Sequence, residues 1–176
     1  MKKIIYYVAS SLDGFIAGPN DDIRLFMEGG PGVDQYLSDL QSFKTVIMGR
    51  RTYEFGYRFG LKPGQPAYPH MTHHIFSRSL HFANAAESVH IEPLDLERIR
   101  QIKADAPTDI YLCGGGQFAG WLLKNQLIDV LKIKLNPILL GQGVPLFGDA
   151  GQTAKLQLTE RQSFPDGLQI LSYQIP

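Results

Sequence analysis

The sequence has one cysteine, no net charge and no long apolar run, and each absence excludes a class of protein. With Cys113 alone, the chain cannot form an internal disulfide, which suits a reducing compartment. Seventeen Lys and Arg residues balance seventeen Asp and Glu residues, so no overall field attracts nucleic acid or an anionic membrane. The apolar run after Lys3 covers only Ile4–Ala9, and Asp13 soon follows. This indicates the first strand of a cytoplasmic protein rather than a signal peptide or a membrane span.

What the sequence does contain is the patterning of an α/β domain. Its 176 residues, 44% hydrophobic and 19% charged, suffice for one core and predict one domain over residues 1–176. Apolar runs between turn residues predict strands at Ile4–Ala9, Thr45–Met48, His74–Ser77, Ser88–Ile91 and Asp109–Cys113, and a run of strands from Leu127–Asn136 onward. Helical spacing predicts helices over Val33–Phe43, over a segment capped by Asp95, and after the glycines at 114–116.

The end of the chain is expected to form an antiparallel hairpin. Ala154–Ser163 and Leu168–Gln174 are separated by Pro165-Asp166-Gly167, a strong turn signal. Together with the preceding elements, this predicts a mostly parallel central sheet of about eight strands that ends in the hairpin.

One strand before that hairpin is expected to face solvent on one side. Lys132 and Lys134 alternate there with Ile133 and Leu135. Because successive side chains of a strand point to opposite faces, this alternation predicts one apolar face and one solvated face.

The most informative feature is the glycine turn within Ile110–Gly116. An apolar, β-prone strand ends in Gly114, Gly115 and Gly116, and a helical pattern follows from Gln117. Glycines let a backbone approach a ligand closely, and a helix start offers free N–H groups, so the turn favours phosphate binding. The spacing is not the dinucleotide fingerprint GxGxxG, because Gly120 lies one residue too far along. An ordinary turn remains the other interpretation of the glycines.

Two other strand ends carry guanidinium and hydroxyl groups. Gly49-Arg50-Arg51-Thr52 follows one strand, and Ser77-Arg78 ends the next. A guanidinium can hold a phosphate through two parallel hydrogen bonds, although either segment alone is also explained by surface arginines. Ligands of open α/β sheets bind at the carboxyl ends of strands, so the three strand ends together predict a polyanionic nucleotide.

No metal site is expected. His70, His73 and His74 are close in the sequence, but the surrounding loop does not fix their geometry. His73 and His74 are adjacent, which sends them to opposite faces of a strand. Cys113 ends an apolar strand, which favours a packing thiol over a nucleophile.

Four segments carry a resemblance to a known family, in the family's order. They are Ser11–Ala17, Val46–Thr52, Tyr111–Gly116, and the stretch from Leu127-Ile128-Asp129 to Pro137–Phe147. On these segments the chain resembles the dihydrofolate reductase-like superfamily, and more closely its riboflavin-biosynthesis pyrimidine reductase branch, the reductase domain of bifunctional deaminase-reductases. The last segment typifies this branch. The resemblance implies a three-layer α/β sandwich and an NADPH-dependent reductase.

The resemblance also implies which residues bind NADPH. It places Gly49, Arg50, Arg51 and Thr52 at the cofactor phosphates, Ser77 and Arg78 at the adenosine 2′-phosphate, and Ala9, Ile16 and Ala17 beside the nicotinamide ring. It places Cys113, Gly114, Gly115, Gly116, Gln117 and Phe118 at the pyrophosphate and nicotinamide. It further implies a cis peptide bond between Gly114 and Gly115, and a homodimer.

The substrate side has two candidate catalytic acids. Asp13 belongs to the branch's Leu-Asp-Gly motif, and Asp34 stands where dihydrofolate reductases carry a pterin-binding acid. Asp34 also suits the first turn of a helix, whose dipole it complements. The expected reaction is hydride transfer to a small pyrimidine- or pterin-like substrate, first of all 5-amino-6-(5-phosphoribosylamino)uracil. The alternatives are a dihydrofolate reductase and a non-catalytic protein that binds NADPH or another nucleotide.

Overall fold

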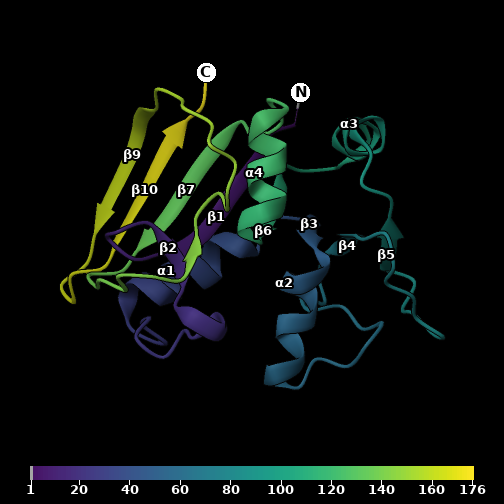
Figure 1. The fold of residues 1–176 in the computed structure, drawn as a ribbon, viewed down its shortest axis with the longest axis horizontal. Coiled ribbons are helices and arrows are strands. Elements are labelled where there is room, and N and C mark those ends of the chain that lie inside the picture. Colours follow the sequence, from purple (N-terminus) through teal and green to yellow (C-terminus); the bar gives the residue numbers. More distant parts are fainter. Residues whose placement is uncertain (1) are drawn as a thin grey trace.

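The computed structural model describes residues 2–176 and has one eight-stranded sheet at its centre (Figure 1). The two strands that end the chain lie antiparallel at one edge, and the other six are parallel. In spatial order the strands are β5 (Val89–Glu92), β4 (Thr72–Phe76), β3 (Thr45–Gly49), β6 (Ile110–Gly114), β1 (Ile4–Ser10), β7 (Val130–Leu135), β10 (Gln169–Gln174) and β9 (Gln157–Ser163). The predicted mostly parallel sheet with a terminal hairpin is confirmed.

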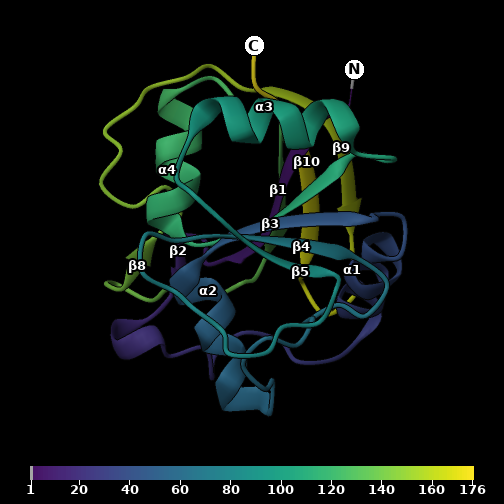
Figure 2. The same ribbon diagram turned by 90° about the vertical axis from the view of Figure 1, so that its right-hand side faces the viewer.

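Helices cover both faces of this sheet. Figure 2 shows α3 (Leu96–Asp105) and α4 (Gly116–Lys124) on one side and α1 (Pro31–Leu40) on the other. Parallel strands covered in this way are buried on both faces, which is why they read as continuous apolar runs. Ile4, Tyr6 and Tyr7 in β1 have no exposed surface.

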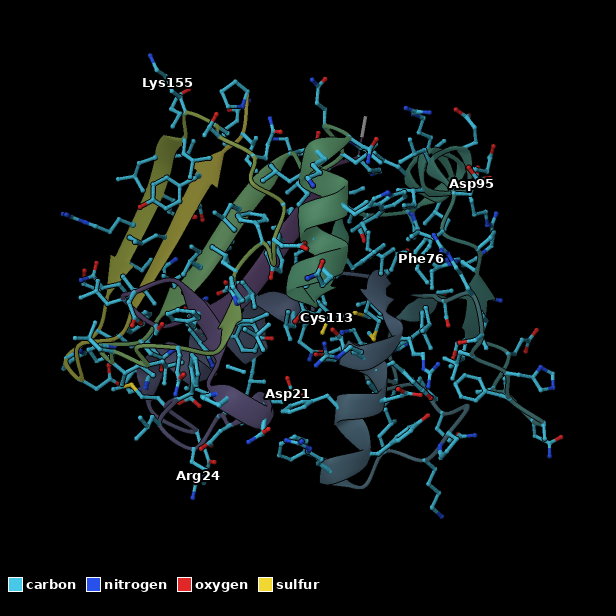
Figure 3. The ribbon with its side chains drawn as sticks, in the orientation of Figure 1. Asp21, Arg24, Phe76, Asp95, Cys113 and Lys155 are labelled. Carbon is cyan, nitrogen blue, oxygen red and sulfur yellow. The ribbon has the colours of Figure 1, made fainter. Side chains whose placement is uncertain are left out.

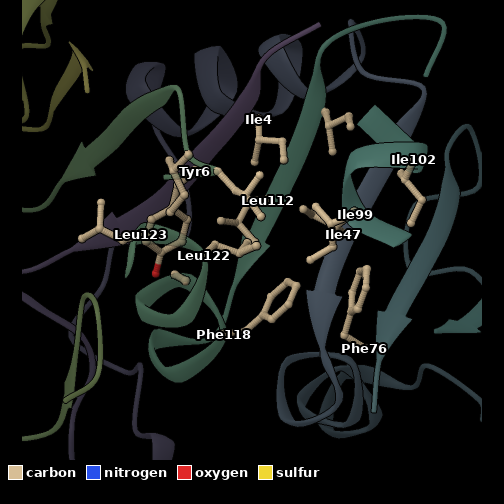
Figure 4. Close-up of a cluster of buried hydrophobic side chains, with 14 of the residues drawn as sticks. Ile4, Tyr6, Ile47, Phe76, Ile99, Ile102, Leu112, Phe118, Leu122 and Leu123 are labelled. Atoms are coloured by element: carbon tan, nitrogen blue, oxygen red, sulfur yellow. The ribbon is translucent and has the colours of Figure 1, made fainter. Parts of the chain in front are cut away.

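The two faces have separate hydrophobic cores. Ile4, Tyr6 and Leu112 point toward α3 and α4, where they pack with Ile99 and Leu122 (Figure 4). The side toward α1 buries another set, which includes Tyr7, Val33, Leu40, Val46, Met48, Tyr111 and Ile170. Fully burying one such aliphatic side chain contributes about 1.5–3 kcal/mol, so these layers hold the strand ends of the site in place.

The helices follow the sequence closely. Helix α3 begins after Asp95, whose side chain accepts a hydrogen bond from the Glu97 N–H at 3.0 Å, as the capping pattern predicts. Helix α1 begins at Pro31, two residues before the predicted start. Of the helices in residues 2–176, none combines the length and apolarity that crossing a membrane requires.

The long connections contain short elements that the sequence did not indicate. β2 (Phe15–Ala17) and the 3₁₀ helix η1 (Pro19–Asp21) follow β1, and α2 (Arg50–Phe55) with η2 (Gly56–Phe59) follow β3. β2 pairs with β8 (Val144–Pro145) in a separate two-stranded sheet. Elements of two to six residues leave too little periodicity to be recognised from sequence.

The terminal hairpin has the predicted turn. The Gly167 N–H donates to the Phe164 carbonyl at 3.0 Å, and the Phe164 N–H donates to the Leu168 carbonyl at 2.9 Å. β9 begins at Gln157, three residues later than expected, and its side chains are almost all exposed.

β7 is a strand as predicted, but the prediction of a solvated lysine face is wrong. Lys132 is half-buried and Lys134 has only 8% of its surface exposed. Their ammonium groups lie over the rings of Tyr7 in β1 and Tyr36 in α1, because α1 covers this face. The alternation correctly predicts that the two lysines share a face, but it does not predict that α1 covers this face.

Candidate functional site

The carboxyl ends of β1, β3 and β6 border a cavity of about 360 Å³. This volume lies in the range of about 300–1,000 Å³ typical of small-molecule sites. The cavity wall contains every residue predicted to bind the cofactor except Ser77 and Arg78. These wall residues are Ala9, Ile16, Ala17, Gly49, Arg50, Arg51, Thr52, Cys113, Gly114, Gly115, Gly116, Gln117 and Phe118. Figure 3 shows Cys113 between α2 and the segment that carries Asp21.

The glycine turn joins β6 to α4. Gly114 has φ +136° and Gly115 has φ +93°, values that only glycine adopts readily. The prediction of a cis bond between these two residues is wrong, since residues 2–176 contain no cis peptide bond. The chain turns instead through these two positive φ angles.

Close packing around the turn also requires glycine. A Cβ on Gly115 would lie 2.7 Å from Thr52 Oγ1, so the start of α4 lies directly against α2. A Cβ on Gly116 would lie 2.3 Å from the Pro145 carbonyl oxygen, which belongs to β8. The starts of α4 and α2 and the strand β8 are therefore in contact at the turn, where bare backbone lines the cavity.

The arginines after β3 supply positive charge to the cavity. Arg50 is held by Glu54, whose Oε1 lies 2.9 Å from its Nε, and by Ser79, whose Oγ accepts from its Nη1 at 2.8 Å. Arg51 is largely exposed, and its Nη2 lies 3.6 Å from Asp21 Oδ2. One guanidinium is thus fixed by the protein and the other is freer to meet a ligand.

Ser77 and Arg78 lie beside the cavity rather than in its wall. β4 ends at Phe76, and Ser77 Oγ accepts hydrogen bonds from the N–H groups of Ser79 at 3.2 Å and Leu80 at 2.9 Å. This turn carries Ser79, which binds Arg50, so it lies next to α2. The Arg78 side chain is exposed.

Another wall of the cavity comes from the small β2–β8 sheet. Ile16, Ala17 and Val144 line the cavity, and the Leu146 N–H donates to the Gly14 carbonyl at 3.0 Å. Five residues that line the cavity were not predicted from the sequence: Val8, Asp21, Ile23, Phe55 and Val144. Asp21 and Ile23 belong to the long glycine-rich segment after β1, whose length is a signal of a functional loop.

Neither predicted acid lines the cavity. The exposed Asp13 carboxylate holds the loop before β8, accepting the Leu140 N–H at 3.1 Å and the Gly141 N–H at 2.7 Å. Asp34 is exposed in the first turn of α1, where an acid complements the helix dipole. The structure does not bring these two acids together.

Cys113 is half-buried in the cavity wall. Its Sγ lies 3.5 Å from the hydroxyl of Tyr68, and burial raises the pKa of the thiol. A thiol with a raised pKa stays protonated at neutral pH and is a poor nucleophile, in keeping with a packing role.

The histidines have separate partners. His73 is fully buried: its Nε2 accepts the Tyr68 N–H at 3.1 Å and its Nδ1 lies 3.1 Å from the Met71 carbonyl oxygen. His74 Nδ1 lies 2.7 Å from Glu92 Oε1 on the neighbouring strand β5. Within residues 2–176, no three His, Cys, Asp or Glu side chains are grouped as metal ligands would be.

Two curated relatives match nearly the whole chain. The uncharacterized protein YwjB of Bacillus subtilis (strain 168) is 30% identical over 176 residues, which cover 96% of each chain. The uncharacterized protein YyaP of the same organism is 25% identical, with 98% of this chain and 94% of YyaP covered.

Solved structures share the fold. A putative riboflavin biosynthesis protein from Shewanella sp. PV-4 superimposes with a TM-score of 0.82 and 24% identity, with 100% of this chain and 99% of that chain covered. A deaminase/5-amino-6-(5-phosphoribosylamino)uracil reductase from Thermotoga maritima gives a TM-score of 0.71 at 14% identity, covering 99% and 57%. Dihydrofolate reductase from Enterococcus faecalis, complexed with NADP(H), gives 0.68 at 15% identity, covering 98% and 96%. The predicted dihydrofolate reductase-like fold is confirmed.

The family follows from the sequence match. The model of the RibD C-terminal domain matches residues 2–170, which include all the strand ends of the cavity. This match agrees with the resemblance carried by the glycine turn and by Pro137–Phe147. The chain belongs to the RibD C-terminal domain family.

Proposed function

We propose that this protein is an NADPH-dependent reductase that transfers a hydride to a pyrimidine- or pterin-like substrate, in the manner of 5-amino-6-(5-phosphoribosylamino)uracil reductases. One observation carries the proposal. Residues from β1, β2, β3, α2, β6 and α4 that the family resemblance assigns to NADPH line a single cavity at the carboxyl edge of the sheet. Family membership supports the same reaction class.

The cavity residues fit such a cofactor. Arg50 and Arg51 offer guanidinium groups for phosphates, and Gly114, Gly115 and Gly116 leave the backbone bare where a bound group would pass. Apolar side chains of Val8, Ile16, Phe55, Phe118 and Val144 offer a surface for flat rings. When bound, NADPH supplies the hydride from its nicotinamide.

The protein's own contribution is position and exclusion of water. The β2–β8 sheet and the glycine turn form adjoining walls, which would orient the acceptor carbon and keep solvent from the reacting atoms. With a riboflavin-type substrate, that carbon is C1′ of the ring-opened ribosylamino group.

Dihydrofolate is the weaker substrate candidate. Dihydrofolate reduction in this superfamily relies on an acid for the pterin, and the sequence offers Asp34 in that place. Asp34 is exposed at the start of α1 and does not line the cavity. We therefore expect turnover with the ribosylaminopyrimidine to exceed turnover with dihydrofolate.

The test is direct. The purified protein is titrated with NADPH and NADH by tryptophan and nicotinamide fluorescence, and NADPH consumption is then followed with 5-amino-6-(5-phosphoribosylamino)uracil and with dihydrofolate. We expect tighter NADPH than NADH binding and turnover of the pyrimidine. Failure to bind NADPH refutes the proposal. Tight binding without turnover of either substrate supports the non-catalytic alternative.

Two accompanying predictions concern the setting of the enzyme. We propose that it works in the cytoplasm, because its one cysteine suits a reducing compartment, and that it forms a homodimer like other members of the branch. Sedimentation at micromolar concentration tests the second prediction.

A further inference from the structure

Two lysines on β7 occupy similar positions but differ in whether a carboxylate pairs with them. Lys132 and Lys134 share the face under α1, and each ammonium lies over a tyrosine ring, at 4.8 Å from the centre of Tyr7 and 4.7 Å from that of Tyr36. Lys132 also donates to Asp39 Oδ2 at 2.7 Å. Lys134 makes no ion pair with any carboxylate of residues 2–176.

Lys134 is the more buried of the two. Only 8% of its surface is exposed, and this burial lowers the pKa of its ammonium. A buried charge without a counter-charge is strongly disfavoured, and a single cation–π contact offsets little of the lost hydration. A structural lysine here would be expected to have a carboxylate like that of Lys132. Because no such carboxylate is present in the part of the chain that the structure describes, the structure indicates that a ligand supplies the negative charge for Lys134.

The location of Lys134 fits a ligand of the candidate site. Lys134 pairs in register with Ala9 near the carboxyl end of β1, and Ala9 lines the cavity. Because paired residues of adjacent strands point to the same face, the lysine side chain and Ala9 lie next to each other on the α1 side of the sheet.

A row of packed tyrosines connects the lysine to the cavity wall. Under Lys134, the Tyr36 hydroxyl is hydrogen-bonded to that of Tyr111 at 2.7 Å. The Tyr111 ring packs edge-on against Tyr68, whose hydroxyl lies 3.5 Å from Sγ of Cys113 in the cavity wall. Three tyrosine hydroxyls therefore lie on this buried face between Lys134 and the cavity wall.

We propose that Lys134 binds an anionic oxygen of the molecule that accepts the hydride, so that the substrate extends from the cavity past Ala9 toward α1. This inference rests on the proposed function and adds the residue that holds the anionic group of the substrate. The oxygen belongs either to a sugar phosphate or to a side-chain carboxylate. A neutral heterocycle would leave the lysine unmatched, so Lys134 selects against it.

Three variants and two anions test the assignment. Lys134→Met removes the charge and keeps the volume, Lys134→Arg keeps the charge, and Lys132→Met is the matched control on the same face. The probes are ribose 5-phosphate for the phosphate and folate for the carboxylate. Each is titrated by thermal shift, alone and with saturating NADP⁺ so that the arginines of the cofactor loop are occupied.

We expect a probe to raise the Tm of the wild type and to bind about tenfold or more weakly to Lys134→Met, as loss of a charged hydrogen-bond partner implies. Lys134→Arg and Lys132→Met should bind it within a few-fold of the wild type. A response to ribose 5-phosphate identifies a phosphate, and a response to folate a carboxylate. Unliganded Lys134→Met should have a higher Tm than the wild type, whereas Lys132→Met, which orphans Asp39, should have a lower one.

Two results overturn the proposal: neither probe binds the wild type, or Lys134→Met binds the probes as tightly as the wild type does. Failure of the proposed function is a separate result. It is seen when NADP⁺ does not bind, and the titrations without nucleotide still decide the role of Lys134 in that case.

Discussion

Substituting Gly116 by alanine should destabilise the protein although it places a better helix former in α4. A Cβ at this position would lie 2.3 Å from the Pro145 carbonyl oxygen and 2.9 Å from the Gly148 backbone nitrogen. Both atoms are backbone, so relief requires β8 and the turn after it to move. Overpacking of this kind costs about 3 kcal/mol at its upper end, and replacing glycine in a helix recovers at most about 1 kcal/mol. The net loss in the free energy of unfolding should be about 2 kcal/mol.

Urea unfolding measures this loss, with Gly29→Ala as the matched control. A Cβ on Gly29 meets no atom within 4 Å, so the control should be neutral or slightly stabilising. The midpoint should fall for Gly116→Ala while the slope m stays unchanged. Because the displaced segment carries Val144 of the cavity wall, NADPH affinity should fall as well. A Gly116→Ala protein as stable as the control would refute the claim that β8 packs directly on the start of α4.

Three further predictions follow from individual side chains. Arg78→Ala should weaken NADPH binding about tenfold or more and NADH binding little, because only NADPH carries the 2′-phosphate; equal losses would remove Arg78 from that role. Burial lowers the pKa of His73 from 6.5 to about 4, so the unfolded chain takes up the proton first on acidification. Stability should therefore fall by up to about 3 kcal/mol as the pH drops from 6.5 to about 4, and His73→Gln should flatten urea midpoints over this window while His81→Gln does not. Asp13→Ala should speed hydrogen exchange at the Leu140 and Gly141 amides, which its carboxylate holds; unchanged exchange would mean that the loop holds itself.

The parallel half of the sheet could be predicted because its strands are buried on both faces. Runs such as Val46-Ile47-Met48 carry no polar residue, and in the structure each of these three side chains is buried. β9 carries no such signal, since its side chains are nearly all exposed. The sequence identified it only through the turn at Pro165-Asp166-Gly167, which is why its predicted start was three residues too early.

The candidate site could be predicted where strand ends fix it and not where loops do. Gly49–Thr52 and Gly114–Gly116 follow adjacent parallel strands, so topology alone brings them together. Ile23 and Val144 reach the same cavity through long connections whose paths depend on contacts distant in sequence, such as the carboxylate of Asp13 holding the loop before β8. Residue types in those connections do not encode the contacts.

The lysines of β7 show how far a sequence period can lead. Side chains of a strand alternate between its two faces, so Lys132 and Lys134 share a face. A face that carries charges is usually inferred to be exposed to solvent. Here α1 covers the face, so both ammonium groups lose hydration. Lys132 offsets this loss through its ion pair with Asp39, whereas the Lys134 ammonium lies over the ring of Tyr36 with no carboxylate partner in residues 2–176. Folding alone does not explain why an unpaired lysine lies under α1 at position 134, because a methionine would fill the same space at lower free energy. The proposed role explains it, because Lys134 pairs with Ala9, which lines the cavity where we propose that the hydride acceptor binds.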